Sequence, residues 1–248
     1  MSRTGKMSTR PAGIELPVLV DLDWSALGGQ LDDSGFAMTP PLLSPEQCAE
    51  MVGMFDDDAR FRATVIMARH AFGEGSYRYF ADPLPPLVQT LRERLYPNLA
   101  AIANRWAGWL GERRYPETLD GLLDECAAAG QHKPTPLLLR YGPGGYNCLH
   151  QDIYGDLTFP LQFLIMLSRP DEDFTGGESV FVEQRPRRQS RPIVARPRQG
   201  QAVIFPVRHR PALGTRGYHR VQMRHGVSAV HTGDRIVLAS SSTTPDEA

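Results

Sequence analysis

Hydrophobic residues recur at helical spacing through the first half of the chain and in short runs through the second half. A serine at Ser44, followed by proline and then by Gln47, predicts a helix start, because this order of residues forms a capping box. Apolar residues three and four apart predict a second helix over residues 86–110, which Pro97 should end or kink. With a third helix predicted over residues 116–129, the first half is expected to be mainly helical.

Two stretches precede the first predicted helix. Residues 1–13 are expected to be disordered, as terminal segments without an apolar pattern commonly are. Residues 14–23 form a short, apolar, β-branched run that predicts a strand.

The pattern changes after residue 130, where short β-rich runs alternate with glycine and proline. Such runs, without helical patterns between them, favour a sandwich or barrel such as a jelly roll. We expect an α+β fold that is mainly β, with residues 14–248 as a single domain, a helical part over 14–130 and a β core over 131–245. The predicted strands cover residues 135–141, 159–167, 178–183, 192–195, 201–205, 218–224 and 234–240.

Composition is that of an ordinary globular protein, because 41% of the 248 residues are hydrophobic and 22% are charged. No apolar run reaches the roughly 18 residues that span a bilayer, and the first residues are polar, so we expect a cytoplasmic protein. The three cysteines are scattered and predict reduced thiols rather than disulfides. Cys148 is expected to be a small buried hydrophobe, although an extended segment would place it on the same face as His150.

The net charge of −1 conceals an uneven distribution of charge. Residues 184–233 contain no acidic residue and eleven arginines, which would attract anions if they shared one surface. Within this segment, residues 184–199 are expected to form a loop or a crossover hairpin. The arginines are Arg185, Arg187, Arg188, Arg191, Arg196, Arg198, Arg208, Arg210, Arg216, Arg220 and Arg224.

The segment that contains His150 and Asp152 carries the strongest chemical signal. Residues i and i+2 of an extended chain project to the same side, so both side chains can reach one ion. With a distant histidine such as His225, they form a two-histidine, one-carboxylate triad, which leaves half the coordination sphere of Fe(II) open. This pattern predicts an oxygen-activating iron enzyme.

Four motifs together resemble the Fe(II)- and 2-oxoglutarate-dependent dioxygenases, in particular their prolyl-4-hydroxylase-like branch. The resemblance spans about residues 134–240. Its motifs are YGPGGYNCLHQD over residues 141–152, TGGE over 175–178, GQAVIF over 200–205, and HGV from His225 with Arg235 ten positions further on.

The resemblance implies a double-stranded β-helix core, with His150, Asp152 and His225 as the iron ligands. It also implies that Arg235 binds the distal carboxylate of 2-oxoglutarate, a role to which the planar guanidinium is suited. Many members of the branch use lysine here, so arginine is a departure. The implied reaction hydroxylates a C–H bond with Fe(II), 2-oxoglutarate and O₂, and releases succinate and carbon dioxide. Tyr141 is expected to contact the cosubstrate or neighbouring groups, unless it only packs.

Three other histidines compete for the position of the second histidine ligand. His231 more simply caps a turn, and His209 is flanked by arginines that disfavour a dication. His219 lies in a run that alternates as a strand does. His225 is preferred because of the residues that follow it and its spacing to Arg235.

The arginines are the best guide to the substrate. Arg185, Arg187 and Arg188 are candidate contacts to an anionic substrate, and an acid-free run could track single-stranded nucleic acid. The pattern also resembles bacterial oxygenases assigned to oxidative demethylation of damaged nucleic-acid bases. The alternatives are a peptidyl, prolyl-type hydroxylase and a non-catalytic jelly-roll sensor that binds a metal or ligand. The arginines would have no substrate role if they only solvate loops or form structural ion pairs.

Overall fold

The computed structural model describes residues 22–153, 157–185 and 187–242. The disorder expected for residues 1–13 and most of the strand predicted over residues 14–23 lie outside the described residues. Residues 22 and 23 lead directly into helix α1 (Trp24–Ser34). No helix in the described ranges is long and apolar enough to cross a membrane.

Helix α2 (Pro45–Gly53) begins as the sequence predicts. The Ser44 hydroxyl accepts a hydrogen bond from the Gln47 amide at 3.3 Å, and the Gln47 side chain accepts one from the Ser44 amide at 3.0 Å. The two residues satisfy each other's exposed groups at the helix start, which confirms the predicted capping box.

Helix α3 (Pro86–Leu110) does not end at Pro97. The proline removes one backbone hydrogen bond, but the helix is held on both sides of it by buried side chains such as Leu95 and Leu99. Tertiary packing therefore overrides the local preference to stop. The third predicted helix is α4 (Leu119–Ala128).

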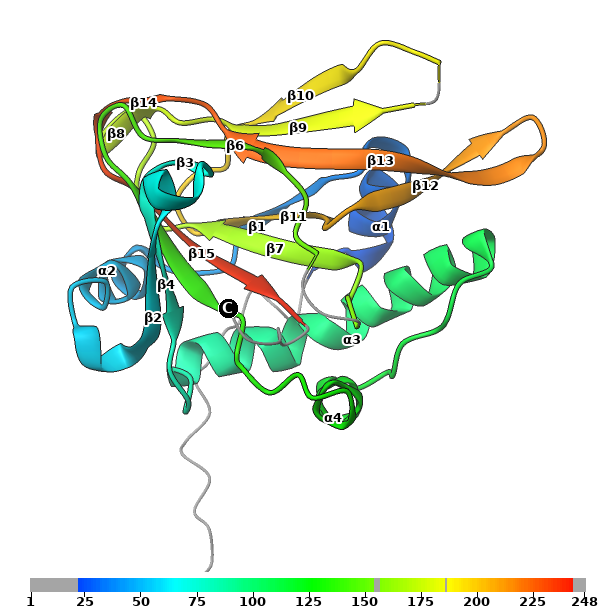
Figure 1. The fold of residues 1–248 in the computed structure, drawn as a ribbon, viewed down its shortest axis with the longest axis horizontal. Coiled ribbons are helices and arrows are strands. Elements are labelled where there is room, and N and C mark those ends of the chain that lie inside the picture. Colours follow the sequence, from blue (N-terminus) through cyan, green and yellow to red (C-terminus); the bar gives the residue numbers. More distant parts are fainter. Residues whose placement is uncertain (1–21, 154–156, 186, 243–248) are drawn as a thin grey trace, which may run out of the picture.

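Two antiparallel sheets face each other and form the two main layers of the molecule (Figure 1). One sheet has seven strands in the order β1-β11-β7-β15-β5-β4-β2; the other has the order β10-β9-β13-β6-β3, with β12 paired to β13. Strands β8 and β14 form a small third sheet. The strand bounds are β1 Ala37–Pro41, β2 Phe61–Ile66, β3 Gly73–Glu74, β4 Ser76–Phe80, β5 Leu137–Tyr141, β6 Tyr146–His150, β7 Leu161–Met166, β8 Phe174–Gly176, β9 Ser179–Gln184, β10 Arg191–Ala195, β11 Gln201–Pro206, β12 His209–Gly214, β13 Gly217–Val227, β14 Val230–Gly233 and β15 Arg235–Ser241.

The predicted fold class is confirmed, and the seven strands predicted after residue 130 are all present within three residues of their expected ends. Residues 184–199 contain the turn and the second strand of the β9–β10 hairpin, in which Arg191 lies opposite Glu183. The helical half also contributes strands that the sequence pattern did not predict. Of these, β1 pairs with β11, and β2 and β4 extend the seven-stranded sheet beyond β5.

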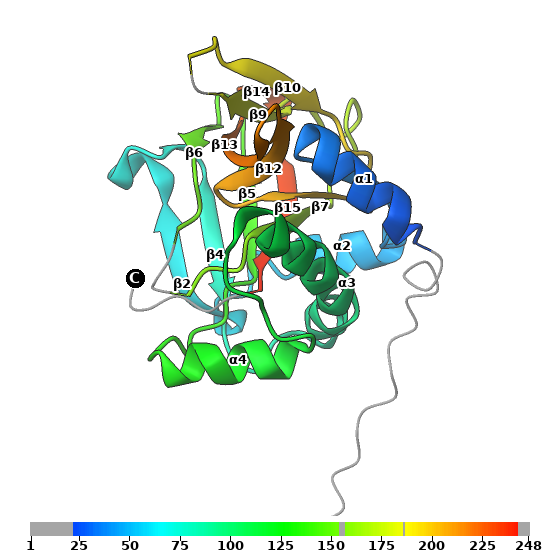
Figure 2. The ribbon, with the colours of Figure 1, turned by 90° about the vertical axis from the view of Figure 1, so that its right-hand side faces the viewer.

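Helices α3 and α4 lie beneath the seven-stranded sheet, on the side away from the second sheet (Figures 1 and 2). The largest apolar core joins these helices to that sheet, and Leu138 and Ile165 are fully buried in it. A smaller core lies between the two sheets and includes Phe181, Phe205 and Met223.

Candidate active site

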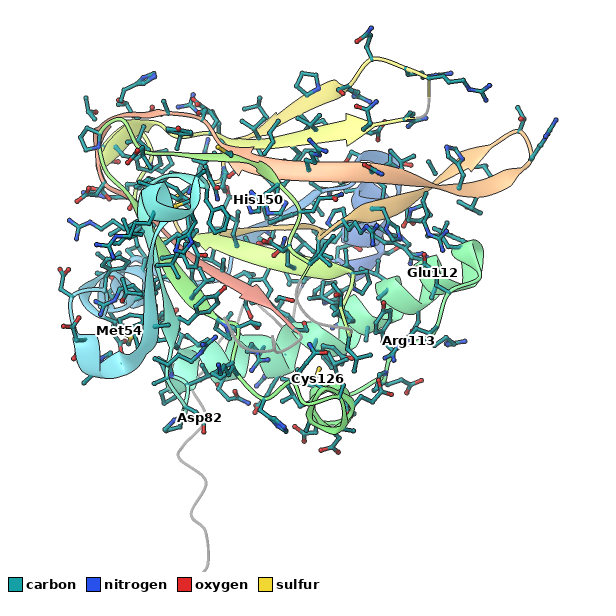
Figure 3. All side chains as sticks on the ribbon, in the orientation of Figure 1. Met54, Asp82, Glu112, Arg113, Cys126 and His150 are labelled. Atoms are coloured by element: carbon teal, nitrogen blue, oxygen red, sulfur yellow. The ribbon has the colours of Figure 1, made fainter. Side chains whose placement is uncertain are left out.

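Strand register brings three predicted ligands together between the sheets. His150, at the end of β6, lies directly opposite His225 of β13, and their ring centroids are 4.3 Å apart. Asp152 follows two residues after His150, so that one possible ligand atom from each of the three residues lies within 4.8 Å of the others. Figure 3 labels His150 between the two layers. The geometry is that of a compact centre for a single cation.

Hydrogen bonds fix which atoms face the centre. The Nδ1 atom of His150 donates to the Cys148 carbonyl oxygen at 2.8 Å, which leaves Nε2 as the ring nitrogen that faces the centre and could bind a metal. His150 Nε2 lies 3.4 Å from Asp152 Oδ1, and His225 Nε2 lies 2.9 Å from Asp152 Oδ2. Both imidazoles therefore direct the same nitrogen toward one carboxylate.

The charge states of Asp152 and His225 suit a metal centre. Burial opposes ionisation of Asp152, but the two neighbouring histidines hold its pKa well below the usual value. Burial lowers the pKa of His225 despite the neighbouring carboxylate, which favours a neutral imidazole. An ionised carboxylate and a neutral imidazole are the forms that bind divalent iron.

Two glutamines that the sequence analysis did not identify support this centre. Gln162 of β7 donates from Nε2 to Asp152 Oδ2 at 2.7 Å and so fixes the carboxylate. Gln151 donates from Nε2 to the carbonyl oxygens of Arg208 and Met223, at 2.8 and 2.9 Å. Gln162 could have been noticed, because it is the only polar residue in the strand LQFLIM. The bonds of Gln151 depend on distant segments and leave no local pattern.

Arg235 of β15 is completely buried in the wall of the same cavity. Its Nη2 donates to Ser179 Oγ at 3.0 Å, whereas Nε and Nη1 have no hydrogen-bond partner in the described part of the chain. Burial lowers its pKa to about 10, so the guanidinium is charged at neutral pH. Gly177, with φ of +63°, allows this position, because a Cβ there would lie 2.9 Å from the Arg235 Cδ. A buried cation with unused donors is a ready partner for a carboxylate.

Tyr141 of β5 lies directly opposite Arg235 in the strand pairing, and its ring centroid is 5.5 Å from the guanidinium carbon. Its hydroxyl accepts a hydrogen bond from Asn147 Nδ2 at 3.2 Å. Burial raises the pKa of Tyr141 to about 12, so it remains a neutral hydroxyl. Tyr141 therefore forms part of the wall beside Arg235.

The cavity that joins these groups has a volume of about 430 Å³. The three predicted ligands lie on its wall with Arg235, and aromatic side chains complete it, among them Phe72, Tyr77, Tyr79, Tyr141 and Phe205. Cys148 also lines it and is exposed, so the expectation of a buried cysteine is wrong. The alternative, that an extended segment places Cys148 on the same face as His150, agrees with both residues lining this cavity.

The competing histidines lie elsewhere among the described residues. His209 Nε2 is 3.1 Å from a Glu112 carboxylate oxygen, and His219 lies opposite Ala212 in the β12–β13 hairpin. His231 lies in strand β14 and is exposed, so the expected turn cap is wrong. His231 lies in a strand because β14 pairs with β8, and the residues around His231 do not by themselves predict that pairing.

The arginines do not share one surface. Arg210 is buried and paired with Glu183, and Arg196 is paired with Asp171. Arg185 and Arg187 line a second cavity, whereas Arg188 is exposed and does not line it. The sequence could not separate these environments, because a β-strand buries only every second residue of a basic run.

Comparisons with known proteins agree with this fold. A sequence model of the Oxygenase-NA family, described as "oxygenase, catalysing oxidative methylation of damaged DNA", matches residues 75–241. Uncharacterized proteins from two strains of Mycobacterium tuberculosis are 45% identical over 160 residues, which cover 64% of this chain and 69% of theirs.

The similar solved structures share the fold at low sequence identity. A Pseudomonas putida prolyl-4-hydroxylase is 13% identical, with a TM-score of 0.51 over 90% of this chain and 100% of that chain. A Burkholderia pseudomallei oxidoreductase of the 2OG-Fe(II) oxygenase family is 16% identical, with a TM-score of 0.53 over 96% and 99% of the two chains. A Trichoplax adhaerens prolyl hydroxylase is 14% identical, with a TM-score of 0.54 over 89% and 88%.

Proposed function

Because the chain belongs to the Oxygenase-NA family, we propose that it uses Fe(II), 2-oxoglutarate and O₂ to demethylate damaged nucleic-acid bases. One observation carries the proposal: three ligand atoms within 4.8 Å of one another share a cavity with a buried arginine that has unused donors. A facial triad beside a carboxylate-binding guanidinium suits an iron centre with a small dicarboxylate cosubstrate.

The residues of the cavity have distinct tasks in this proposal. His150, Asp152 and His225 hold the iron, and Gln162 keeps the Asp152 carboxylate oriented through its 2.7 Å hydrogen bond. Arg235 binds the far carboxylate of 2-oxoglutarate through Nε and Nη1, the donors that lack partners among the described residues. When bound, iron and 2-oxoglutarate together supply an oxidant that places one atom of O₂ in the substrate and the other in succinate.

The family description joins oxidation, a methyl group and damaged DNA. Adding a methyl group requires a methyl donor, whereas an oxygenase inserts oxygen into a bond that is already present. The methyl group is therefore the substrate: its carbon is hydroxylated, and the product N–CH₂OH loses formaldehyde and leaves N–H. The aromatic wall at Phe72 and Tyr77 suits a flat base that has been turned out of the strand.

The test measures two products in one reaction. The full chain is incubated with Fe(II), 2-oxoglutarate and a single-stranded oligonucleotide that carries one N-methylated base. Mass spectrometry should detect succinate and the loss of one methyl group, and both products should be absent with His225→Ala. His219→Ala is the matched control, because His219 lies on the same strand but outside the cavity; it should retain turnover.

Two other results would replace the proposal. A proline-containing peptide that gains one oxygen, while the oligonucleotide keeps its methyl group, would identify a peptidyl hydroxylase. If neither substrate changes and no succinate forms although Fe(II) binds, the chain is a ligand-binding module rather than an enzyme.

A further inference from the structure

A second cavity, of about 610 Å³, lies where strands β9, β12 and β13 meet the segment that follows α3. It shares no lining residue with the cavity that holds the triad. Its wall contains two glutamines and six ionisable side chains, which are Glu112, Arg185, Arg187, Arg208, His209 and Arg220. With four arginines and one carboxylate, the wall has an excess of three positive charges, apart from His209.

Two of the four arginines have no counterion among the described residues. Arg185 is paired with Glu183, and Arg220 with Glu112. Arg187 and Arg208 are exposed, and their side chains form no hydrogen bond or ion pair with any described residue. These two guanidinium groups therefore have all their donors available to a ligand.

His209 adds a hydrogen-bonding group rather than a further charge. Burial lowers its pKa even though Glu112 opposes the shift, and Arg220 and Arg208 lower it further. A neutral imidazole beside arginines can donate to or accept from an anionic ligand. The cavity thus combines planar cationic donors with neutral polar groups, which is the chemistry that binds phosphate.

The second cavity lies along the same strand as the triad. Gln222 in its wall precedes His225 by three residues of β13, so their backbone positions lie about 10 Å apart at ~3.3 Å per residue, although their side chains project to opposite faces of the strand. Gln151 joins the two cavities, because its side chain lines the first and donates to the Arg208 carbonyl oxygen at the second. Figure 3 labels Glu112, at the second cavity, to one side of His150 and beneath the β12–β13 hairpin.

We propose that the second cavity binds a backbone phosphate of the single-stranded nucleic acid whose methylated base lies at the triad. The inference rests on the proposed function, because it takes the base at the triad as its starting point. That backbone separation is small compared with the several nucleotides that a single-strand-binding groove contacts. Phe72, which is 45% exposed and lines the first cavity, offers a stacking surface for a base, as nucleic acid but not an acidic peptide requires.

A scan of neutral linkages locates the phosphate. Single-stranded oligonucleotides of about ten nucleotides, each with one N-methylated base and one methylphosphonate linkage, are bound to the full chain. One or two positions, within a few nucleotides of the methylated base, should weaken binding about tenfold, as expected for the loss of one charge-assisted contact. Equal binding at every position would overturn the proposal.

Substitutions then connect that position to the cavity. The double variant Arg187→Gln/Arg208→Gln should bind the unmodified oligonucleotide about tenfold more weakly and should no longer respond to the methylphosphonate. Its salt slope should be shallower by about 0.7, the value for one phosphate of a single strand. Arg188→Gln/Arg216→Gln is the matched control, because it removes two exposed arginines outside the cavity. If both double variants behave alike, the cavity has no specific role.

Failure of this inference can be distinguished from failure of the proposed function. If demethylation proceeds while the double variant binds and reacts as wild type, only the phosphate site is wrong. If the methylphosphonate effect and its loss in the double variant are seen without demethylation, the phosphate site stands and the reaction is wrong. A third result would assign the cavity to acidic peptides instead. In that case a poly-glutamate peptide would bind more tightly than the oligonucleotide, and Arg187→Gln/Arg208→Gln would lose this binding.

Discussion

Two fully buried arginines, Arg210 and Arg235, show how the same side chain serves the fold in one region and the chemistry in another. Arg210 of β12 donates from Nε and Nη2 to the Glu183 carboxylate, and from Nη1 to the carbonyl oxygens of Asp32 and Pro211. Arg235 has one hydrogen bond, to Ser179, and two buried nitrogens without partners among the described residues. The donors of Arg210 are used within the fold, because a carboxylate is paired with it. Arg235 has no such carboxylate and keeps donors that can bind a ligand.

This difference has an energetic side. A buried charge without a partner is costly, and burial lowers the pKa of Arg235 to about 10. A protein that keeps such a group gives up stability at the position where a ligand will bind. Removing Arg210 should therefore lower stability, whereas removing Arg235 should weaken ligand binding without lowering stability. This contrast makes the comparison testable.

The largest effect is expected from Arg210→Met. The substitution leaves the Glu183 carboxylate buried with only the partly exposed Arg185 as a counterion, so the free energy of unfolding should fall by about 3–5 kcal/mol. Urea denaturation measures this change. Adding Glu183→Leu should recover most of the loss, because it removes the unpaired charge. If the double variant is as unstable as the single variant, the ion pair is not the reason that Arg210 matters.

Arg235→Met should leave the fold intact and weaken the binding of 2-oxoglutarate. We expect 2-oxoglutarate to bind about 10²-fold more weakly, equivalent to about 3 kcal/mol, because its distal carboxylate loses a charged, planar donor. The free energy of unfolding without cosubstrate should stay the same or rise. Anaerobic calorimetry with Fe(II) measures the affinity for 2-oxoglutarate. The affinity of Arg235→Lys, which keeps the charge, should lie between those of the wild type and Arg235→Met. Unchanged affinity with lowered stability would make Arg235 a second structural arginine.

The sequence predicted much of this arrangement and failed where distant segments decide the environment. The motif around His150 and Asp152 is local, and a two-residue spacing needs only an extended chain. The spacing from His225 identified Arg235, but the structural role of Arg210 is not local, because a neighbouring strand supplies its carboxylate. The pairing partner of Arg210 comes from β9, 27 residues away.

Pro97 and strand β4 illustrate the same limit for the fold. Proline predicts a helix end from its own geometry, yet the burial of α3 on both sides of Pro97 keeps the helix continuous. The strand SYRYF of β4 is too short to be identified alone and is defined by its pairing with β5. The capping box at Ser44 was predictable because all its atoms lie within four residues.

The smallest effect, and the finest probe of the Arg235 region, is expected from Tyr141→Phe. The ring stays beside the guanidinium, but the hydroxyl that accepts from Asn147 is lost, at a cost of about 1 kcal/mol in 2-oxoglutarate binding, or roughly fivefold. Asn147→Ala should have a similar effect, and the double variant should be little worse than either, because the two side chains act through one hydrogen bond. The same anaerobic calorimetry gives all three values. Additive losses would mean that Tyr141 and Asn147 contact the cosubstrate independently. If Tyr141→Phe lost as much affinity as Arg235→Met, the Tyr141 hydroxyl rather than the Arg235 guanidinium would be the main partner of the carboxylate.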